Sequence, residues 1–414
     1  MKPHLALILA LLCSLITACQ PDDPAPDTMR PLALSPVPEL GVHAAAPAPY
    51  RPTPTALPDD IISAADAEYR VLAHLYERVA PSVVYVDVTF APDAQGNQPT
   101  ASGSGFVIDG SGHIVTNAHL VRDSSSILVT FSDGYVTSAV RLGLDIFSDV
   151  AVLRVNANTP LLLPVTFGDS TALHVGERAV SIGNPFGLSS SMTVGIISGL
   201  GRQLPSAELM GSETGDFHNP SIIQIDAHIH AGSSGGPLLN SHAQVIGMTT
   251  AIPTTSGAFE GVGFAVPART IQRVVPELID HGSVAYPWLG IGSASVGTAF
   301  GVAGLAEPLR LPVQTGILIA GIAPGSPADA AGLRGGTREV VVRGRQVCTG
   351  GDILLAIDER AVHSMDDLLY HLMLDYRPGD TVVLRMIRGE TTFDVPILLT
   401  MRPTTSADIP SCGG

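Results

Sequence analysis

Positive charge is scarce in this chain. Charged residues make up 14% of the 414 positions, and 38 Asp and Glu outnumber 22 Lys and Arg, which gives a formal net charge of −16. Binding to nucleic-acid phosphates requires clustered Lys and Arg, and no basic patch stands out in the sequence. The composition therefore argues against a nucleic-acid partner.

Long hydrophobic runs are missing beyond the N-terminus. Met1-Lys2 and the apolar stretch from Leu5 to Ile16 have the charge and length of a signal peptide, and the stretch is too short for an ordinary membrane span. It ends in Leu15-Ile16-Thr17-Ala18-Cys19, which resembles a bacterial lipobox and implies a lipidated Cys19. The alternative is cleavage near Ala18 and release of the protein. Both interpretations predict a signal peptide over residues 1–19 and export to the cell envelope, and lipidation adds a membrane anchor.

Cysteine is also scarce, with four residues in an exported chain. Cys13 would leave with the signal peptide. If Cys19 is acylated, Cys348 and Cys412 remain as a pair in an oxidising compartment. The sequence leaves open whether these two form a disulfide or stay as free thiols.

Glycine and proline are plentiful, with 43 and 33 residues, and 45% of the chain is hydrophobic. Many short strands and turns fit this balance, and the length allows two or three domains. Residues 20–60 are rich in Pro and Ala with little apolar periodicity, which predicts an extended tether.

Residues 61–284 have the pattern of one mainly β domain. Ser63-Ala64-Ala65-Asp66 is typical of a helix start, and Pro81 would end that helix. Short strands with turns between them continue to about residue 266, which indicates an all-β barrel. A helix is expected from about Ala268, with Gly282 as its stop.

Residues 285–403 change in character and predict a small α+β module. Trp288-Leu289-Gly290-Ile291 opens it, Ser326-Pro327 starts a one-turn helix, and Ser364-Met365-Asp366-Asp367 caps a second helix. Residues 404–414 are expected to be a flexible tail.

The loop Ala231-Gly232-Ser233-Ser234-Gly235-Gly236-Pro237 lies between two predicted strands. Taken alone, such a loop is more often a simple turn. A reactive serine, however, needs fixed donors for the oxyanion that it forms, and Gly232 lets the backbone turn its N–H toward a substrate. We therefore interpret Ser234 as a nucleophile.

A serine nucleophile needs a base and a group that orients the base. His119 follows an apolar strand and a turn of small residues, and Asp149 directly precedes the apolar strand Val150-Ala151-Val152-Leu153. Taken singly, His119 is more often structural and Asp149 more often caps a turn. Together, the order His119, Asp149, Ser234 is that of the chymotrypsin-like proteases.

The chain contains, in this order, the motifs T-N-A-H-L-V, S-D-V-A-V-L, F-G-D-S followed by V-G-E-R-A-V-S-I-G-N-P-F-G-L, T-V-G-I-I-S-G-L-G-R, G-S-S-G-G-P-L-L-N and G-V-G-F-A-V-P. With these motifs the sequence resembles the HtrA (high-temperature-requirement) family of trypsin-like serine proteases over roughly residues 63 to 400. The resemblance implies a mainly β fold, with a chymotrypsin-like double six-stranded β-barrel protease domain followed by a small α+β PDZ domain. It also implies a catalytic His119, Asp149 and Ser234 that need no cofactor, an oxyanion hole, and a PDZ loop for a peptide carboxylate. The oxyanion hole would comprise Gly232, Ser233 and Ser234, and the carboxylate loop Trp288, Leu289, Gly290 and Ile291.

The sequence departs from the family pattern close to Ser234. The family usually has Asn where this chain has Ser233, and often has Asn rather than His in the segment from Asp226 to His230. A substrate pocket is expected around Ile229, with Thr249 and Thr250 beside it, either apolar or with a polar, pH-sensitive rim. His228 and His230 would lie on one face of a strand with no third ligand in view, so no metal site is predicted.

The function predicted is that of an exported serine endopeptidase, which cleaves unfolded or misfolded proteins while the PDZ domain binds peptide C-termini. The alternative is a tethered chaperone or PDZ adaptor on an inactive protease scaffold. The resemblance also implies a homotrimer, in which Tyr69 and Tyr76 of the first helix either serve at the contact or belong to the core.

Overall fold

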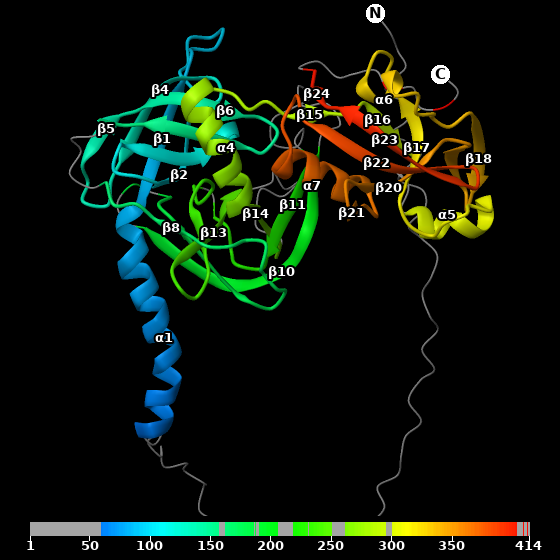
Figure 1. Ribbon diagram of the computed structural model, residues 1–414. Coiled ribbons are helices and arrows are strands. Elements are labelled where there is room, and N and C mark those ends of the chain that lie inside the picture. Colours follow the sequence, from blue (N-terminus) through cyan, green and yellow to red (C-terminus); the bar gives the residue numbers. More distant parts are fainter. Residues whose placement is uncertain are drawn as a thin grey trace, which may run out of the picture. The chain divides into compact units, whose positions relative to one another are not determined.

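The computed structural model describes residues 59–156, 162–185, 187, 190–205, 218–230, 232–250, 261–294, 300–403, 409 and 412 (Figure 1). The chain divides into two units, residues 1–57 and 58–414, and the description concerns the second. The expected signal peptide, Cys19 and most of the Pro/Ala-rich tether lie outside the described residues, as does most of the expected C-terminal tail.

The first sheet has seven strands in the order β5-β4-β1-β2-β3-β7-β6. One residue, Ala139, separates β5 from β6, so the two continue each other along the chain. The strands are β1 (Val83–Phe90), β2 (Thr100–Val107), β3 (His113–Asn117), β4 (Ser124–Thr130), β5 (Val136–Ser138), β6 (Val140–Asp145) and β7 (Val150–Arg154).

The second sheet runs β12-β9-β10-β11-β14-β13-β8. Because β12 also pairs with β13, six of these strands close into a ring, and β8 pairs in parallel with β13. This sheet comprises β8 (Thr166–Phe167), β9 (Arg178–Gly183), β10 (Ser191–Pro205), β11 (His218–Ile225), β12 (Pro237–Leu239), β13 (Gln244–Thr250) and β14 (Gly263–Pro267). The expected mainly β architecture is confirmed.

Two longer helices flank these sheets. Helix α1 (Asp59–Val79) leads into the short 3-10 turn η1 (Ala80–Ser82), and α4 (Ala268–His281) ends at Gly282 in the left-handed conformation, as expected. The prediction for the start of α1 was wrong, because the helix begins four residues before Ser63, with Asp59 and Asp60 in its first turn. Acidic side chains are favourable there, since they complement the positive end of the helix dipole. Residues 59 and 60, assigned to the tether, are therefore helical.

The core between the two sheets is apolar. Side chains from both sheets meet there with Leu75 and Val79 of α1 and with Ile271, Val274 and Leu278 of α4. Across the described residues, no helix is long and apolar enough to cross a membrane.

Residues 287 to 401 form the second, smaller fold. Its main sheet has the order β16-β17-β20-β22-β23, with β21 paired to β20. The strands are β15 (Pro287–Trp288), β16 (Ile291–Ser293), β17 (Ile317–Ile322), β18 (Arg338–Val342), β19 (Arg345–Thr349), β20 (Ile353–Ile357), β21 (Arg360–Ala361), β22 (Thr381–Arg388), β23 (Thr391–Leu398) and β24 (Thr400–Met401); the helices are α5 (Val302–Leu309), α6 (Pro327–Ala330) and α7 (Met365–Asp375).

The structure decides the expected helix caps and the pairing of the two cysteines in this fold. Ser326 and Ser364 cap α6 and α7, each accepting a hydrogen bond from the backbone N–H three residues further on. Cys348 and Cys412 form a disulfide, 64 residues apart along the chain. The disulfide was one of the two possibilities that the sequence left open.

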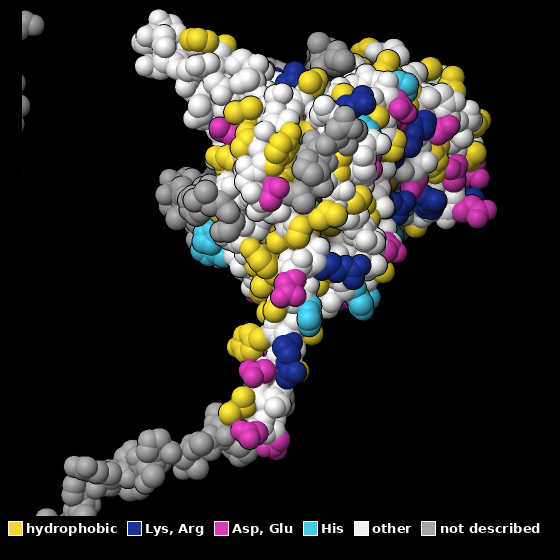
Figure 2. Space-filling model, turned by 90° about the vertical axis from the view of Figure 1, so that its left-hand side faces the viewer, with side chains coloured by type: hydrophobic (Ala, Val, Ile, Leu, Met, Phe, Trp, Pro, Cys, Tyr) yellow, Lys and Arg dark blue, Asp and Glu magenta, His cyan; other side chains and the backbone are white. Residues whose placement is uncertain are grey.

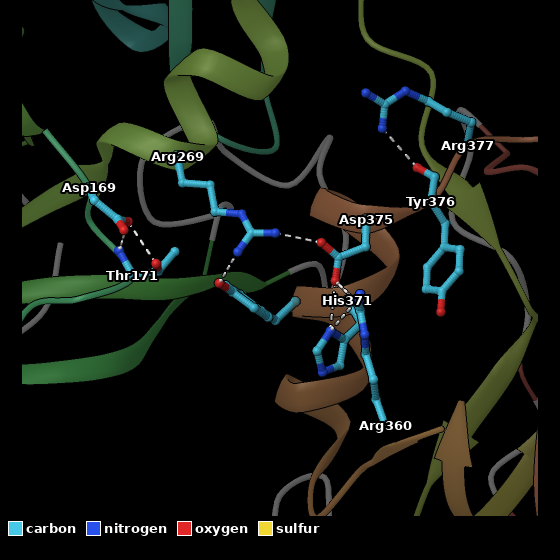
Figure 3. A network of polar contacts seen from close by, with 9 residues as sticks. Asp169, Thr171, Arg269, Arg360, His371, Asp375, Tyr376 and Arg377 are labelled. Carbon is cyan, nitrogen blue, oxygen red and sulfur yellow. Dashed lines mark hydrogen bonds and ion pairs between the residues drawn. The ribbon is translucent and has the colours of Figure 1, made fainter. Parts of the chain in front are cut away.

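Helix α7 is tied to α4 by a polar network (Figure 3). Arg269, in the first turn of α4, donates to the hydroxyl of Tyr370 at 3.2 Å and to a carboxylate oxygen of Asp375 at 2.6 Å. His371, 2.9 Å from Asp375, and Arg360 contact the same carboxylate. Asp375 is mostly buried and receives several donors, so its ion pair with Arg269 fixes α7 to α4.

Candidate active site

Asp149 and His119 lie side by side. Asp149 directly precedes β7, and His119 lies in the short helix α2 (Ala118–Val121), which directly follows β3. His119 Nδ1 is 3.0 and 2.9 Å from the two carboxylate oxygens of Asp149, and the His119 backbone N–H donates to the same carboxylate at 2.9 Å. Asp149 is 1% exposed, whereas the His119 side chain keeps 25% of its surface. The structure therefore brings together two of the three residues that the sequence singled out as catalytic and leaves the imidazole accessible.

Two further donors hold the Asp149 carboxylate. Asn117 Nδ2 donates to its Oδ2 at 2.9 Å, and the Thr250 hydroxyl donates to the same atom at 3.0 Å. A buried carboxylate is costly unless it is hydrogen-bonded, and these donors satisfy it. Sequence analysis missed Asn117, although its position two residues before His119 is a signal that could have found it.

The backbone of Asp149 is strained, with φ at 60°, which is uncommon for a residue other than glycine. Its carbonyl accepts from the N–H of Ala118, the residue before His119, at 3.2 Å. The left-handed turn thus directs both the carboxylate and the carbonyl of Asp149 at the segment that carries His119.

The electrostatics of the pair favour a charged imidazole. Burial disfavours the protonated form of His119, but the negative charge of Asp149 and the hydrogen bond to it outweigh burial, so the pKa of His119 is raised above its ordinary value. An imidazole held this way is a stronger base toward a neighbouring hydroxyl.

The loop that carries Ser234 is fastened to β2. The N–H of Ser104 donates to the Ser234 carbonyl at 2.8 Å, and the Ser104 hydroxyl donates to the Gly232 carbonyl at 2.6 Å. A Cβ on Gly103 would lie within 3.0 Å of both the Ser234 carbonyl and the Leu120 side chain. Since Leu120 directly follows His119, the loop and the histidine turn converge on the same glycine. The sequence did not predict the part that Ser104 plays.

Two glycines allow this close approach. Gly235 has φ at 87°, and a Cβ there would lie 2.1 Å from the Ser104 carbonyl oxygen. A Cβ on Gly183 of β9 would lie 2.8 Å from Cα of Ser233. Any side chain at these positions would push the serine loop away from the sheets.

The expected oxyanion hole needs one correction. Gly232, with φ at 88°, is free of the steric limits of other residues, as expected. The N–H of Ser233, however, donates to the His230 carbonyl at 2.9 Å, so it is not directed at a substrate. The turn that this bond closes explains why Ser233 drops out of the predicted set.

The expected pocket residues have different surroundings. Ile229 is 9% exposed and packs in an apolar cluster of the second sheet. Thr249 is fully buried, and its hydroxyl donates to the Ser233 carbonyl at 2.8 Å, while Thr250 bonds Asp149. The two threonines thus brace the serine loop and the aspartate, which sequence analysis did not predict.

His228 and His230 have their ring centroids 4.3 Å apart and their planes tilted by 34°. Two imidazoles alone are fewer protein ligands than a zinc site uses. Within the described part of the chain, no group of three or more His, Cys, Asp or Glu side chains could hold a metal ion.

The segment expected to bind a peptide carboxylate lies next to α6. Gly290 has φ at 79°, and a Cβ there would lie 2.2 Å from Cβ of Ser326. Leu289 and Ile291 are buried in the core of the smaller fold. The strand that follows, β16, is an edge strand of its sheet.

Two parts of the chain match known protein domains. Residues 103–248 match the trypsin-like peptidase domain, and residues 288–399 match the PDZ domain. "Protease Do-like 1, chloroplastic" of Arabidopsis thaliana is 38% identical over 337 residues, which are 80% of this chain and 72% of that protein. The chain belongs to the HtrA family of serine proteases. The family assignment made from the sequence is therefore confirmed.

Other members of the HtrA family are similarly close. "Probable periplasmic serine endoprotease DegP-like" of Chlamydia trachomatis is 38% identical over 303 residues, which cover 73% of this chain and 54% of that protein. The chain thus spans about half the length of that relative. The solved structure "HtrA-type protease AlgW with tripeptide" matches with a TM-score of 0.64 at 29% identity, covering 80% of this chain and 97% of that one. By this membership the chain is a serine protease with a trypsin-like domain followed by a PDZ domain.

Proposed function

We propose that this protein hydrolyses peptide bonds with Ser234 as nucleophile, His119 as general base and Asp149 as the group that orients the base. The observation that carries the proposal is the bond between His119 Nδ1 and a buried Asp149, which leaves Nε2 of an accessible imidazole on the side away from the carboxylate. The fastening of the Ser234 loop to Ser104 supports it further.

In the first step Ser234 Oγ attacks the scissile carbonyl, and its proton passes to His119 Nε2. The Asp149 carboxylate stabilises the imidazolium that forms. The backbone N–H groups of Gly232 and Ser234 stabilise the oxyanion, each contributing about 3 kcal/mol to lowering the barrier. His119 then protonates the leaving amine, and water releases the acyl group from Ser234.

Substrate side chains would be received beside Ile229, near the bracing threonines Thr249 and Thr250. We propose that the substrates are unfolded or misfolded polypeptides, because a strand-binding cleft accepts an extended chain and folded proteins rarely offer one. In the PDZ domain, the loop from Trp288 to Ile291 would hold a peptide carboxylate while the edge strand β16 pairs with the peptide backbone.

Export to the cell envelope is supported by the signal-like N-terminus and by relatives whose names describe them as periplasmic. We propose that Cys19 carries the membrane anchor.

We propose that the protein assembles into a homotrimer and that the exposed surface of α1 contacts the other subunits. Figure 2 shows hydrophobic side chains along the part of this helix that extends from the sheets. Ile62, Tyr69 and Val71 are 41%, 69% and 38% exposed. Tyr76, by contrast, donates to the Ser190 carbonyl at 2.6 Å, so it packs on the protease domain.

The test of the proposed activity is Ser234→Ala, assayed on denatured casein and with a fluorophosphonate probe. We expect cleavage and labelling by the wild type and neither by the variant. Ser125→Ala, an exposed serine on β4, is the control and should leave both unchanged. Cleavage by Ser234→Ala at the wild-type rate would refute the assignment of the nucleophile.

A further inference from the structure

The turn that presents Asp149 is held by another buried carboxylate, Asp145. The backbone N–H groups of Phe147 and Ser148 donate to Asp145 at 3.2 and 3.1 Å, and the Ser148 hydroxyl donates to it as well. Asn219 of β11 also holds this turn, because its Nδ2 donates to the Ser148 carbonyl at 3.1 Å. Because Asp149 directly follows Ser148 and has strained φ, its conformation depends on these bonds.

Another donor to Asp145 comes from far along the chain. The Tyr286 hydroxyl donates to Asp145 Oδ2 at 2.5 Å, across 141 residues of sequence. Burial, and then the charge of Asp145, raise the pKa of Tyr286 well above its ordinary value, so the hydroxyl keeps the proton that it donates. Its ring also packs edge-on against Phe147, with centroids 5.7 Å apart.

Tyr286 directly precedes the first strand of the PDZ domain. The next two residues form β15, which pairs with β24, and the N–H of Arg402, just after β24, donates to the Tyr286 carbonyl at 2.8 Å. The Arg402 guanidinium lies 5.5 Å from the centroid of the Phe147 ring. Residues at both ends of the PDZ fold, Tyr286 and Arg402, therefore contact the turn that leads to Asp149.

We propose that Tyr286 is a positioning residue for Asp149. Through its bond to Asp145, Tyr286 fixes the turn that directs the Asp149 carboxylate at His119. The rate of peptide hydrolysis then depends on the position of the segment that leads into the PDZ domain. The inference rests on the proposed function, because it assumes that Asp149 orients the base. It assigns to Tyr286 a role in the chemistry that requires no contact with the substrate.

The test compares Tyr286→Phe with the wild type in the full-length protein. Phe keeps the ring that packs on Phe147 and removes the hydroxyl. The hydrogen bond to Asp145 is charge-assisted, so we expect kcat for casein and the rate of fluorophosphonate labelling to fall about tenfold, with KM unchanged. The matched control is Tyr376→Phe, which breaks a similar bond, from Tyr376 to Asp358 at 2.6 Å, within the PDZ domain; its rates should equal those of the wild type.

A second readout does not need catalysis. The His119 Nδ1 proton shared with Asp149 gives a low-field NMR resonance, and we expect Tyr286→Phe to shift or broaden it while Tyr376→Phe does not. Should Tyr286→Phe fail to fold, Asp145→Asn, which keeps the side-chain shape and removes the charge, takes its place with the same expectations.

Each outcome decides the proposal. Labelling by Tyr286→Phe at the wild-type rate, or an equal loss in Tyr376→Phe, would overturn the positioning role while leaving the proposed activity intact. If the wild type neither labels nor cleaves casein, the proposed activity fails. The NMR resonance then decides the role of Tyr286, and an unchanged resonance in Tyr286→Phe would overturn it.

Discussion

At the scale of single residues, the charge of Asp149 sets the working pH range. His119 must be neutral to accept the Ser234 proton, and its pKa is raised by Asp149 despite burial. Activity should therefore fall, as pH is lowered, at a pH above the ordinary histidine value of about 6.5. In Asp149→Asn this acid limb should move to lower pH, and kcat should drop roughly 10⁴-fold.

The measurement is the pH profile of kcat/KM on denatured casein for the wild type and Asp149→Asn. His113, 2.6 Å from Asp109, supplies the control, because Asp109→Asn perturbs a similar pair away from Ser234 and should leave the profile unchanged. An acid limb that stays in place in Asp149→Asn would show that another group titrates.

A second residue-scale prediction concerns Gly235. Alanine there would take a left-handed conformation, at about 1–2 kcal/mol, and its Cβ would collide with the Ser104 carbonyl oxygen 2.1 Å away. We expect Gly235→Ala to abolish fluorophosphonate labelling and to lower the free energy of unfolding by about 3 kcal/mol or more. Gly134 has the same conformation, with φ at 86° and nothing near its Cβ position, so Gly134→Ala should show only the backbone cost and normal labelling. Similar losses in both variants would count against the close approach.

Sequence reasoning found the residues of this site whose chemistry is distinctive, and missed those that only hold them. His119 and Asp149 were predicted from their side chains and order. Asn117 and Ser104 were not, and Thr250 was expected in a substrate pocket and not as a donor to Asp149. Amides and hydroxyls occur at many positions, and only folding shows which of them are buried and which groups they bond.

At the scale of elements, sequence signals worked best at helix ends. Ser364 was expected to cap α7, and its hydroxyl accepts from the Asp367 N–H at 3.2 Å. Removing this acceptor leaves one N–H of the first turn without its partner. Ser364→Ala should therefore lower the free energy of unfolding of the PDZ domain by about 1 kcal/mol.

Urea unfolding of the full-length protein measures this effect, and Ser364→Gly is the matched control. Glycine also lacks the hydroxyl but adopts the cap conformation easily, so it should cost only a few tenths of a kcal/mol. Equal losses for Ala and Gly would contradict the proposed cause.

The same type of signal failed at α1. The helix begins at Asp59 and not near Ser63, because a capping pattern marks where a helix is able to start and does not prevent the preceding residues from joining it. Strand pairing was equally out of reach of local patterns. The ring closure between β12 and β13 depends on contacts across the sheet that no local segment encodes.

At the scale of the whole molecule, the disulfide fastens the end of the chain to the PDZ domain. Cys348 lies in β19, in a hydrophobic cluster with Val302, Leu305 and Leu318, and Cys412 packs against that cluster. The sequence could not decide this pairing, because two cysteines 64 residues apart meet only if the hairpin of β18 and β19 and the C-terminal segment fold together.

Cys412→Ser tests what this link contributes. Cross-linking residues 64 apart restricts the unfolded chain, which by loop entropy stabilises the fold by about 4 kcal/mol. We expect Cys412→Ser, and the wild type treated with dithiothreitol, to lose this amount in urea unfolding of the PDZ domain. Fluorophosphonate labelling of Ser234 should be unchanged, because its loop is held by Ser104 and Thr249 within the protease domain. An unchanged free energy of unfolding on reduction would contradict the expected stabilisation. Slower labelling would show that the disulfide affects Ser234 through contacts other than those of Ser104 and Thr249.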